Sequence, residues 1–164
     1  MGSVEDLIKD HYYIRKSIHG LEVILLKAQK ENTLSLYFFK SFVNFAKKFI
    51  DNCHHGKEEK CFFPCLEKLG IPKEGGPIGV MLKEHELGRI LIKKIEEKIN
   101  LYEKGEIKVD ELLDACYEYI DLMKNHMFKE ENILFRIGKQ IMNENDDKET
   151  FECQEDLEKQ IGEH

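Results

Sequence analysis

Apolar residues recur along this chain at steps of three and four, the spacing that places them on one face of an α-helix. In the first such stretch the apolar stripe includes Leu7, Ile14 and Ile18. No stretch shows the alternation of apolar and polar residues that is typical of a β-strand. We therefore predict four amphipathic helices, at residues 3–30, 34–69, 78–103 and 110–143.

The segments between these stretches are short and contain residues that end helices. The clearest is residues 70–77, with three glycines and two of the three prolines of the chain. Short loops make neighbouring helices antiparallel, and four apolar stripes are most simply buried against one another. The predicted fold is all-α, an up-and-down antiparallel four-helix bundle over residues 1–143. Residues 144–164 are acidic and weakly periodic, so we expect a C-terminal tail or short helix there.

Composition narrows the class of protein. A chain of 164 residues can bury one core and is too short for two ordinary domains. Its net charge is -7, and Lys and Arg alternate with Asp and Glu, so we expect no nucleic-acid partner. No apolar run is long enough to span a bilayer, and the first residues lack the pattern of a signal peptide. We expect a cytoplasmic protein without a membrane partner, and leave a protein partner or a homodimer open.

The five cysteines are an odd number in a chain without an evident export signal. A disulfide framework is not expected, and free thiols are the default interpretation. Cys61 and Cys65 lie four residues apart on one predicted helix, with Cys53 just before His54, so a separate zinc or redox site is an alternative. Buried, unreactive thiols are the preferred interpretation, because free Cys packs as a small apolar residue.

One short motif occurs twice in the chain. Residues 54–63 and 126–135 both read H-x-x-K-E-E-x-x-[FL]-F. A His and a Glu four residues apart lie on the same face of a helix, about one turn from each other. The other two predicted helices each carry one His directly after an acidic residue, at Asp10-His11 and Glu84-His85. The two halves of the chain therefore look like copies of one unit.

The histidines and glutamates of this repeat lie on the apolar stripes and are expected to be buried. A carboxylate buried without a partner is costly, and a metal cation is a natural partner for it. Four imidazoles and two carboxylates are more than one tetrahedral zinc needs, and suit two iron or manganese ions bridged by both carboxylates. The predicted ligands are His11, His54, Glu58, His85, His126 and Glu130.

Some choices stay open at this point. His55 and Glu59 have the same spacing as the chosen pair on their helix, although alignment of the two repeats favours the chosen pair. Glu131 is likewise an alternative to Glu130. For any single histidine, a hydrogen-bonded core residue would be the ordinary interpretation. The contribution of all four helices favours a metal.

The order H…HxxxE…H…HxxxE in a bundle of this length resembles the hemerythrin-like, or HHE cation-binding, family over about residues 3–143. The resemblance implies a non-haem di-iron centre, carboxylate- and oxo-bridged, held by the six residues named above, with manganese or zinc less expected. It also implies binding of or reaction with dioxygen, peroxide or nitric oxide, for sensing, scavenging or delivery under oxidative or nitrosative stress. The alternatives are an enzyme for peroxide or nitric oxide detoxification or for iron-sulfur centre repair, and iron storage or transfer. Whether the protein is an enzyme stays open.

The sequence departs from the oxygen-carrying hemerythrins at two positions. Those proteins have a second His four residues after the one in the third helix, where this chain has Arg89. They have an Asp five residues after the last His, where this chain has Glu131. A five-His oxygen carrier is therefore not expected, and the missing imidazole favours reactivity or sensing over reversible carriage. Arg89 is expected to pair with a carboxylate or to act as a gate.

Overall fold

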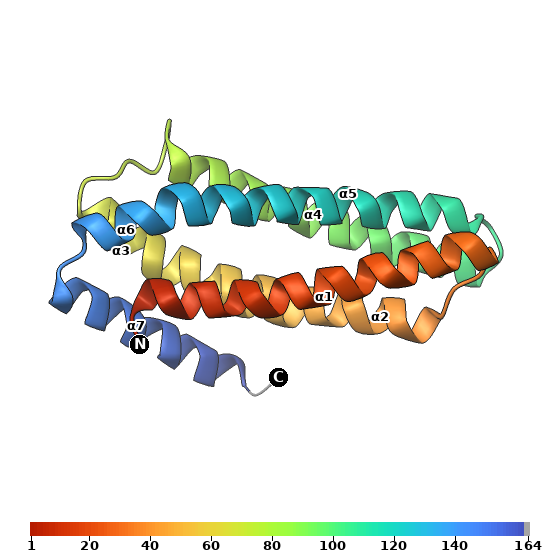
Figure 1. Ribbon diagram of the computed structural model, residues 1–164, viewed down its shortest axis with the longest axis horizontal. Coiled ribbons are helices and arrows are strands. Elements are labelled where there is room, and N and C mark those ends of the chain that lie inside the picture. The colour runs from red at the N-terminus through yellow and green to blue at the C-terminus, as the bar shows by residue number, and fades with distance from the viewer. Residues whose placement is uncertain (163–164) are drawn as a thin grey trace.

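The structure is a computed structural model, and residues 1–162 are described. Four long helical segments lie side by side in it, joined end to end by short connections (Figure 1). They are α1 (Ser3–Glu31), the α2–α3 segment, α4 (Pro77–Glu103) and the α5–α6 segment. The α2–α3 segment comprises α2 (Leu36–Phe45), η1 (Ala46–His55), η2 (Glu58–Phe62) and α3 (Phe63–Lys68). The α5–α6 segment comprises α5 (Val109–Lys129), η3 (Glu130–Leu134) and α6 (Phe135–Ile141). Residues 1–162 contain no strand, and the predicted all-α bundle is confirmed.

The apolar stripes of the four segments meet in two buried clusters. The larger cluster extends from Ile14 towards the end of the bundle where α1 connects to α2. The smaller one lies at the opposite end and includes Leu7, Phe62 and Phe135. The layer between Leu7 and Ile14 is thus closed at both ends by apolar side chains, which exclude water and lower the local dielectric constant.

The helices of the repeated motif are not α-helical throughout. η1, η2 and η3 are π-helical turns, with hydrogen bonds to the fifth residue along the chain. Such turns often occur at functional sites. Here η1 ends at His55, η2 begins at Glu58 and η3 begins at Glu130. Because a π-turn is wider than an α-turn, successive side chains differ by a smaller rotation, and His54 and His55 are both buried.

The acidic C-terminal segment forms a further helix, α7 (Glu144–Ile161), which packs across α1 and the α2–α3 segment (Figure 1). A capping box starts it, in which Asn143 and Asp146 each accept a hydrogen bond from the backbone of the other. The buried side chain of Gln154 donates to the Ser3 carbonyl and to Asp6. Residues 163–164 of the predicted extension lie outside the described part, and a domain boundary at residue 143 stays a prediction.

A disulfide joins Cys61 to Cys153 of α7, so the expectation of free thiols is wrong for these two residues. The sequence could not indicate this pair, because it depends on where α7 docks. Cys53, Cys65 and Cys116 are free. Burial raises the pKa of Cys53 to about 11 and that of Cys116 to about 12, which keeps both as unreactive thiols.

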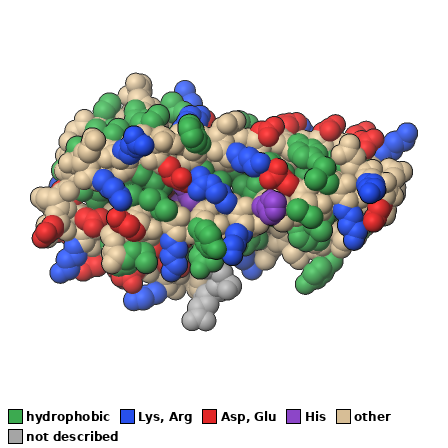
Figure 2. Space-filling model, viewed as in Figure 1, with side chains coloured by type: hydrophobic (Ala, Val, Ile, Leu, Met, Phe, Trp, Pro, Cys, Tyr) green, Lys and Arg blue, Asp and Glu red, His purple; other side chains and the backbone are tan. Residues whose placement is uncertain are grey.

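The surface carries both signs of charge. Figure 2 shows Lys and Arg side chains interspersed with Asp and Glu over the visible face. Within residues 1–162, every helix is too short or too polar to cross a membrane.

Candidate metal centre

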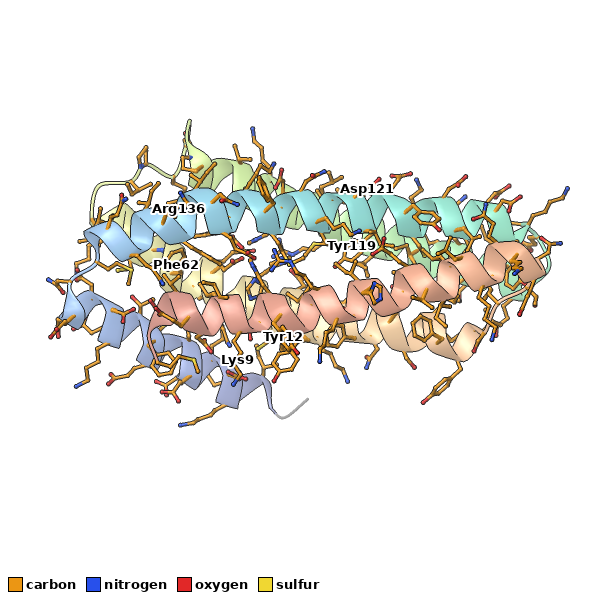
Figure 3. The ribbon with its side chains drawn as sticks, in the orientation of Figure 1. Lys9, Tyr12, Phe62, Tyr119, Asp121 and Arg136 are labelled. Carbon is orange, nitrogen blue, oxygen red and sulfur yellow. A yellow bond between two sulfur atoms is a disulfide. The ribbon has the colours of Figure 1, made fainter. Side chains whose placement is uncertain are left out.

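The six predicted ligands come from all four segments of the bundle and meet in the layer between the two apolar clusters. None of them is more than 1% exposed. Figure 3 shows nitrogen and oxygen atoms gathered inside the bundle between Phe62 and Tyr119. The structure thus brings the six residues together, and their role as ligands stays a prediction.

The ligand atoms form two groups, and within each group they lie within 4.8 Å of one another. The first group, here called the two-His position, is His11, His54, Glu58 and Glu130. The second group, the three-His position, is His55, Glu58, His85 and His126. Glu58 belongs to both groups. Each group has the donor types and the spacing of a metal site.

The two carboxylates reach towards both positions. Glu58 places Oε2 3.4 Å from His54 Nε2 and Oε1 3.1 Å from His85 Nε2. Glu130 places Oε1 3.1 Å from His11 Nε2 and Oε2 3.8 Å from His126 Nε2. Each carboxylate therefore has one oxygen on each side of the cluster, as a bridging carboxylate requires.

Every histidine of the cluster directs its Nδ1 outward to a carboxylate. The distances are 2.6 Å for His11 to Glu131, 3.1 Å for His54 to Asp10, 3.3 Å for His55 to Asp51, 2.7 Å for His85 to Glu59 and 2.9 Å for His126 to Glu84. A carboxylate accepts a hydrogen bond from Nδ1–H, so it fixes the tautomer in which Nε2 carries a lone pair. All these lone pairs point into the cluster.

Acceptor atoms therefore face one another inside the cluster without donors between them. Within residues 1–162, no hydrogen-bond partner reaches the Nε2 atoms of His55, His85 and His126, either oxygen of Glu58, or Oε2 of Glu130. The Nε2 atoms of His11 and His54 lie only 3.0 Å apart. Buried polar atoms in proteins are nearly always paired. A cation at each position would satisfy these atoms, so the residues present fit a pair of metal ions.

Burial of the cluster also shifts the pKa values of its side chains. Burial raises the pKa of Glu58 to about 8, and burial with the nearby charge of Glu58 raises that of Glu130 to about 7. Burial lowers the pKa of His55 to about 3 and that of His85 well below its ordinary value. The metal-free cluster therefore resists charge, whereas a cation stabilises the ionised carboxylates and displaces their protons.

His55 lies in the cluster beside the six predicted ligands and is a seventh candidate ligand. The chain was expected to lack a fifth imidazole because Arg89 stands where oxygen carriers have a histidine. His55 supplies that imidazole from the opposite helix, with its ring centroid 3.8 Å from that of His85. The open choice between His54 and His55 thus has a different outcome, since both enter the cluster. The signal in the sequence was Asp51, four residues earlier and able to hold the His55 ring.

Glu59 and Glu131 lie outside the cluster as acceptors for the Nδ1 atoms, so neither replaces its neighbour. Arg89 pairs with Glu59 at 2.6 Å, and Arg15 pairs with Glu131 at 2.7 Å. Arg89 also donates to Asp51, which confirms its expected pairing with a carboxylate.

The lysines of the motif pair in the same way with the carboxylates that accept from His54 and His126. Lys57 Nζ lies 3.0 Å from Asp10, and Lys129 pairs with Glu84. The repeat therefore reads [DE]-H-x-x-x-R in one helix and H-x-x-K-E-E in the other. Sequence reasoning overlooked Arg15 and the role of the outer carboxylates as Nδ1 acceptors, although the repeat itself contained these residues.

Comparison with known proteins identified one matching family model. A sequence model described as the hemerythrin HHE cation-binding domain matches residues 2–137. Searches of curated proteins and of solved structures gave no significant match.

Proposed function

The chain belongs to the hemerythrin family of HHE cation-binding domains, and we propose that it is a non-haem di-iron protein that binds or reacts with dioxygen, peroxide or nitric oxide. The observation that carries the proposal is the unequal pair of positions that share Glu58. Five imidazoles and two carboxylates are donors that iron accepts readily. Two irons held in this way would supply redox chemistry and a free coordination position.

The two-His position is the expected place for the small ligand, because it receives one imidazole fewer from the protein. His11 and His54 are the imidazoles there, and both are buried. The ring of Phe135 stacks at a tilt 5.2 Å from that of His11, and Phe62 packs on Phe135. These rings exclude bulk water, so the surroundings favour a small ligand of low polarity over a hydrated ion.

Iron content and the visible spectrum test this proposal. The protein is reconstituted with ferrous iron without air, and absorption is recorded before and after dioxygen, peroxide and nitric oxide are each added. We expect about two irons per chain and a new visible absorption band with at least one of the three. One zinc per chain, or no iron at stoichiometric level after reconstitution, would exclude the di-iron centre. A Met127→Leu variant is the matched control, since Met127 is a buried neighbour of the ligands.

Turnover is the second candidate, and one observation favours it. A cavity borders His55 and His85, which leaves room for a second reactant beside the three-His position. Peroxide consumption over many equivalents per iron pair would support an enzyme. A single stoichiometric spectral change would support binding. Iron storage fits less well, because all the ligands are buried and fixed by carboxylates that would have to open at each release.

A cytoplasmic location belongs to the same proposal. Disulfides are rare in the cytosol, so the bond between Cys61 and Cys153 gives a direct test. Alkylation of the protein inside cells, followed by mass spectrometry, would find both thiols free in a reducing compartment. A complete disulfide in cells would place the protein in an oxidising one.

A further inference from the structure

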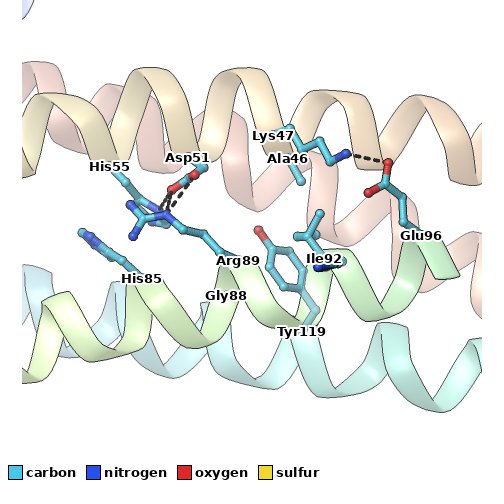
Figure 4. A pocket seen from close by; sticks show the side chains of 11 residues that line it. Ala46, Lys47, Asp51, His55, His85, Gly88, Arg89, Ile92, Glu96 and Tyr119 are labelled. Carbon is cyan, nitrogen blue, oxygen red and sulfur yellow. Dashed lines mark hydrogen bonds and ion pairs between the residues drawn. The ribbon is translucent and has the colours of Figure 1, made fainter. Parts of the chain in front are cut away.

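A cavity of about 400 Å³ opens between the α2–α3 segment and α4, next to the candidate metal centre (Figure 4). His55 and His85 lie at one end, and Arg89 lies beside them. Ala46, Gly88 and Ile92 make much of the remaining wall apolar. A volume of this size is in the range of small-molecule sites and far exceeds the needs of a diatomic gas.

The internal repeat explains why a cavity exists on this side. Alignment of His85 with His11 places Gly88 opposite Ile14, three residues after each histidine. Ile14 is fully buried and packs in the larger apolar cluster. Gly88 leaves the corresponding volume unfilled. A Cβ atom built on Gly88 would meet its nearest neighbours, Leu122 and Tyr119, at 3.8 Å, so the position has space for a side chain.

One unpaired hydroxyl belongs to the cavity wall. Tyr119 is 2% exposed, and within residues 1–162 its hydroxyl has no hydrogen-bond partner. Figure 4 shows this hydroxyl directed across the cavity towards the helix that carries Ala46 and Asp51. Burial raises the pKa of Tyr119 above its ordinary value, so the phenol keeps its proton and can donate.

Most of the charged side chains of the wall are already paired. Arg89 donates from Nε to Asp51, from Nη2 to Glu59 and from Nη1 to Glu86. Lys47 pairs with Glu96 at the outer part of the wall. Lys93 also borders the cavity and has no ion pair among the described residues, but it is exposed to solvent. The buried free donor beside the apolar wall is the Tyr119 hydroxyl.

We propose that this cavity binds a small, uncharged, mainly apolar organic molecule that offers one hydrogen-bond acceptor, such as a ketone oxygen, to the Tyr119 hydroxyl. Its apolar part lies against Gly88, Ala46 and Ile92. Binding needs neither iron nor turnover, so the inference is independent of the proposed di-iron function.

The test is a titration of the full-length protein, metal-free and iron-loaded, with 4-fluoroacetophenone, followed by ¹⁹F NMR. A matched probe, 1-ethyl-4-fluorobenzene, has the same ring but no acceptor. We expect saturable binding of the ketone with a dissociation constant of roughly 0.1 to 1 mM, and weaker binding of the ethyl compound. No saturable binding of the ketone up to its solubility would overturn the inference. Loss of iron binding with retained ketone binding would contradict the proposed function alone.

Two variants locate the site. Gly88→Ile copies the other half of the repeat, fills the cavity and should weaken the ketone at least tenfold. Tyr119→Phe should weaken the ketone about fivefold and leave the ethyl compound unchanged, because only the hydrogen bond is lost. Gly20→Ala is the control for a helical glycine, since a Cβ there meets nothing within 4 Å. If Gly88→Ile does not fold, Gly88→Ala and the methyl NMR shift of Ile92 on titration replace it. Unchanged ketone binding in both Gly88 variants, or an unmoved Ile92 methyl, would overturn the assignment.

Discussion

The two halves of the bundle, residues 3–68 and 77–141, build the same frame from the same positions. In each half one helix supplies an acidic residue, a histidine and an arginine, and the other supplies a histidine, a lysine and two glutamates. The arginine of each half fixes a glutamate of the other, and that glutamate fixes the histidine preceding the arginine. The halves thus lock each other, and the pseudo-symmetry alone would give two equal metal positions.

The two halves differ at two positions beside the repeated motif. Asp51 and His55 of the first half align with Met123 and Met127 of the second. The first half therefore adds a third imidazole to the position that the second half supplies with two. The repeated residues therefore make a frame that could hold metal at two positions, and the residues that differ make the two positions unequal.

The two halves also differ in how deeply the lysine of the repeated motif is buried. Lys57 of the first half is fully buried under α7 and contacts Asp6, Asp10 and Glu158. The side chain of its counterpart Lys129 is 39% exposed. α7 thus covers the lysine of the first half, whereas the corresponding lysine of the second half is partly exposed to solvent.

The largest effect on iron binding is expected from the two glutamates that occupy equivalent positions in the two halves. Glu58→Gln and Glu130→Gln each remove a carboxylate that faces both positions, so each variant should lose both irons, with affinity reduced more than about 100-fold. The metal-free variants should be as stable as the parent or more so, because a buried ionisable group is gone. Iron per chain and urea unfolding measure the two effects. Full iron content in either variant would exclude a bridging role.

The corresponding lysines of the two halves, Lys57 and Lys129, should differ in how much each contributes to the free energy of unfolding. Lys57→Met leaves Asp6 and Asp10 without their buried cation and should lower the free energy of unfolding by about 3 to 5 kcal/mol. Lys129→Met removes a partly exposed pair and should cost about 0.2 to 1 kcal/mol. Urea unfolding of the metal-free proteins measures both. Equal losses in the two variants would show that α7 does not bury the first site.

His55 is the residue that separates the two positions. His55→Met makes the first half like the second, and should weaken iron at the three-His position by about 10- to 100-fold while the two-His position keeps its iron. Anaerobic ferrous titration should then show one tight and one weak iron per chain. Met127→Leu is the control and should bind both irons as the parent does. Two equally tight irons in His55→Met would mean that His55 is a core histidine.

The smallest effect is the pH dependence of the metal-free protein. At pH 6.5 the folded chain keeps protons on Glu58 and Glu130, whose pKa values are raised to about 8 and 7, whereas the unfolded chain has already released them. The folded chain loses these protons as the pH rises to 8. The folded state binds more protons, so the free energy of unfolding should fall by about 1 to 2 kcal/mol across this range. His55 and His85, whose folded pKa values are lowered, oppose this decline in part near pH 6.5, where the unfolded imidazoles are half protonated, and are neutral in both states towards pH 8. The double variant Glu58→Gln with Glu130→Gln should lack the decline, and a parent that gains stability over the same range would contradict it.

The fold was accessible from the sequence because helical periodicity and short loops are local features. The bounds of α1 and α4 fall within one residue of the predicted ranges. The burial of the repeated histidines and glutamates followed from the same stripe. All of this depends on residues a few positions apart.

The rest depends on geometry that a 3.6-residue period does not contain. His55 enters the cluster because π-turns alter the rotation between neighbours, so a strict α-helical pattern assigns it to another face. The disulfide of Cys153 depends on the docking of α7, which only tertiary contacts determine. The cavity beside Gly88 becomes visible in the sequence only when the two halves are aligned and Ile14 is found opposite.

The most direct test of two unequal iron positions is the Mössbauer spectrum of anaerobic protein reconstituted with ⁵⁷Fe, recorded with the iron content. We expect about two irons per chain and two quadrupole doublets of equal area, one for each position. A single doublet, or one iron per chain, would contradict this expectation.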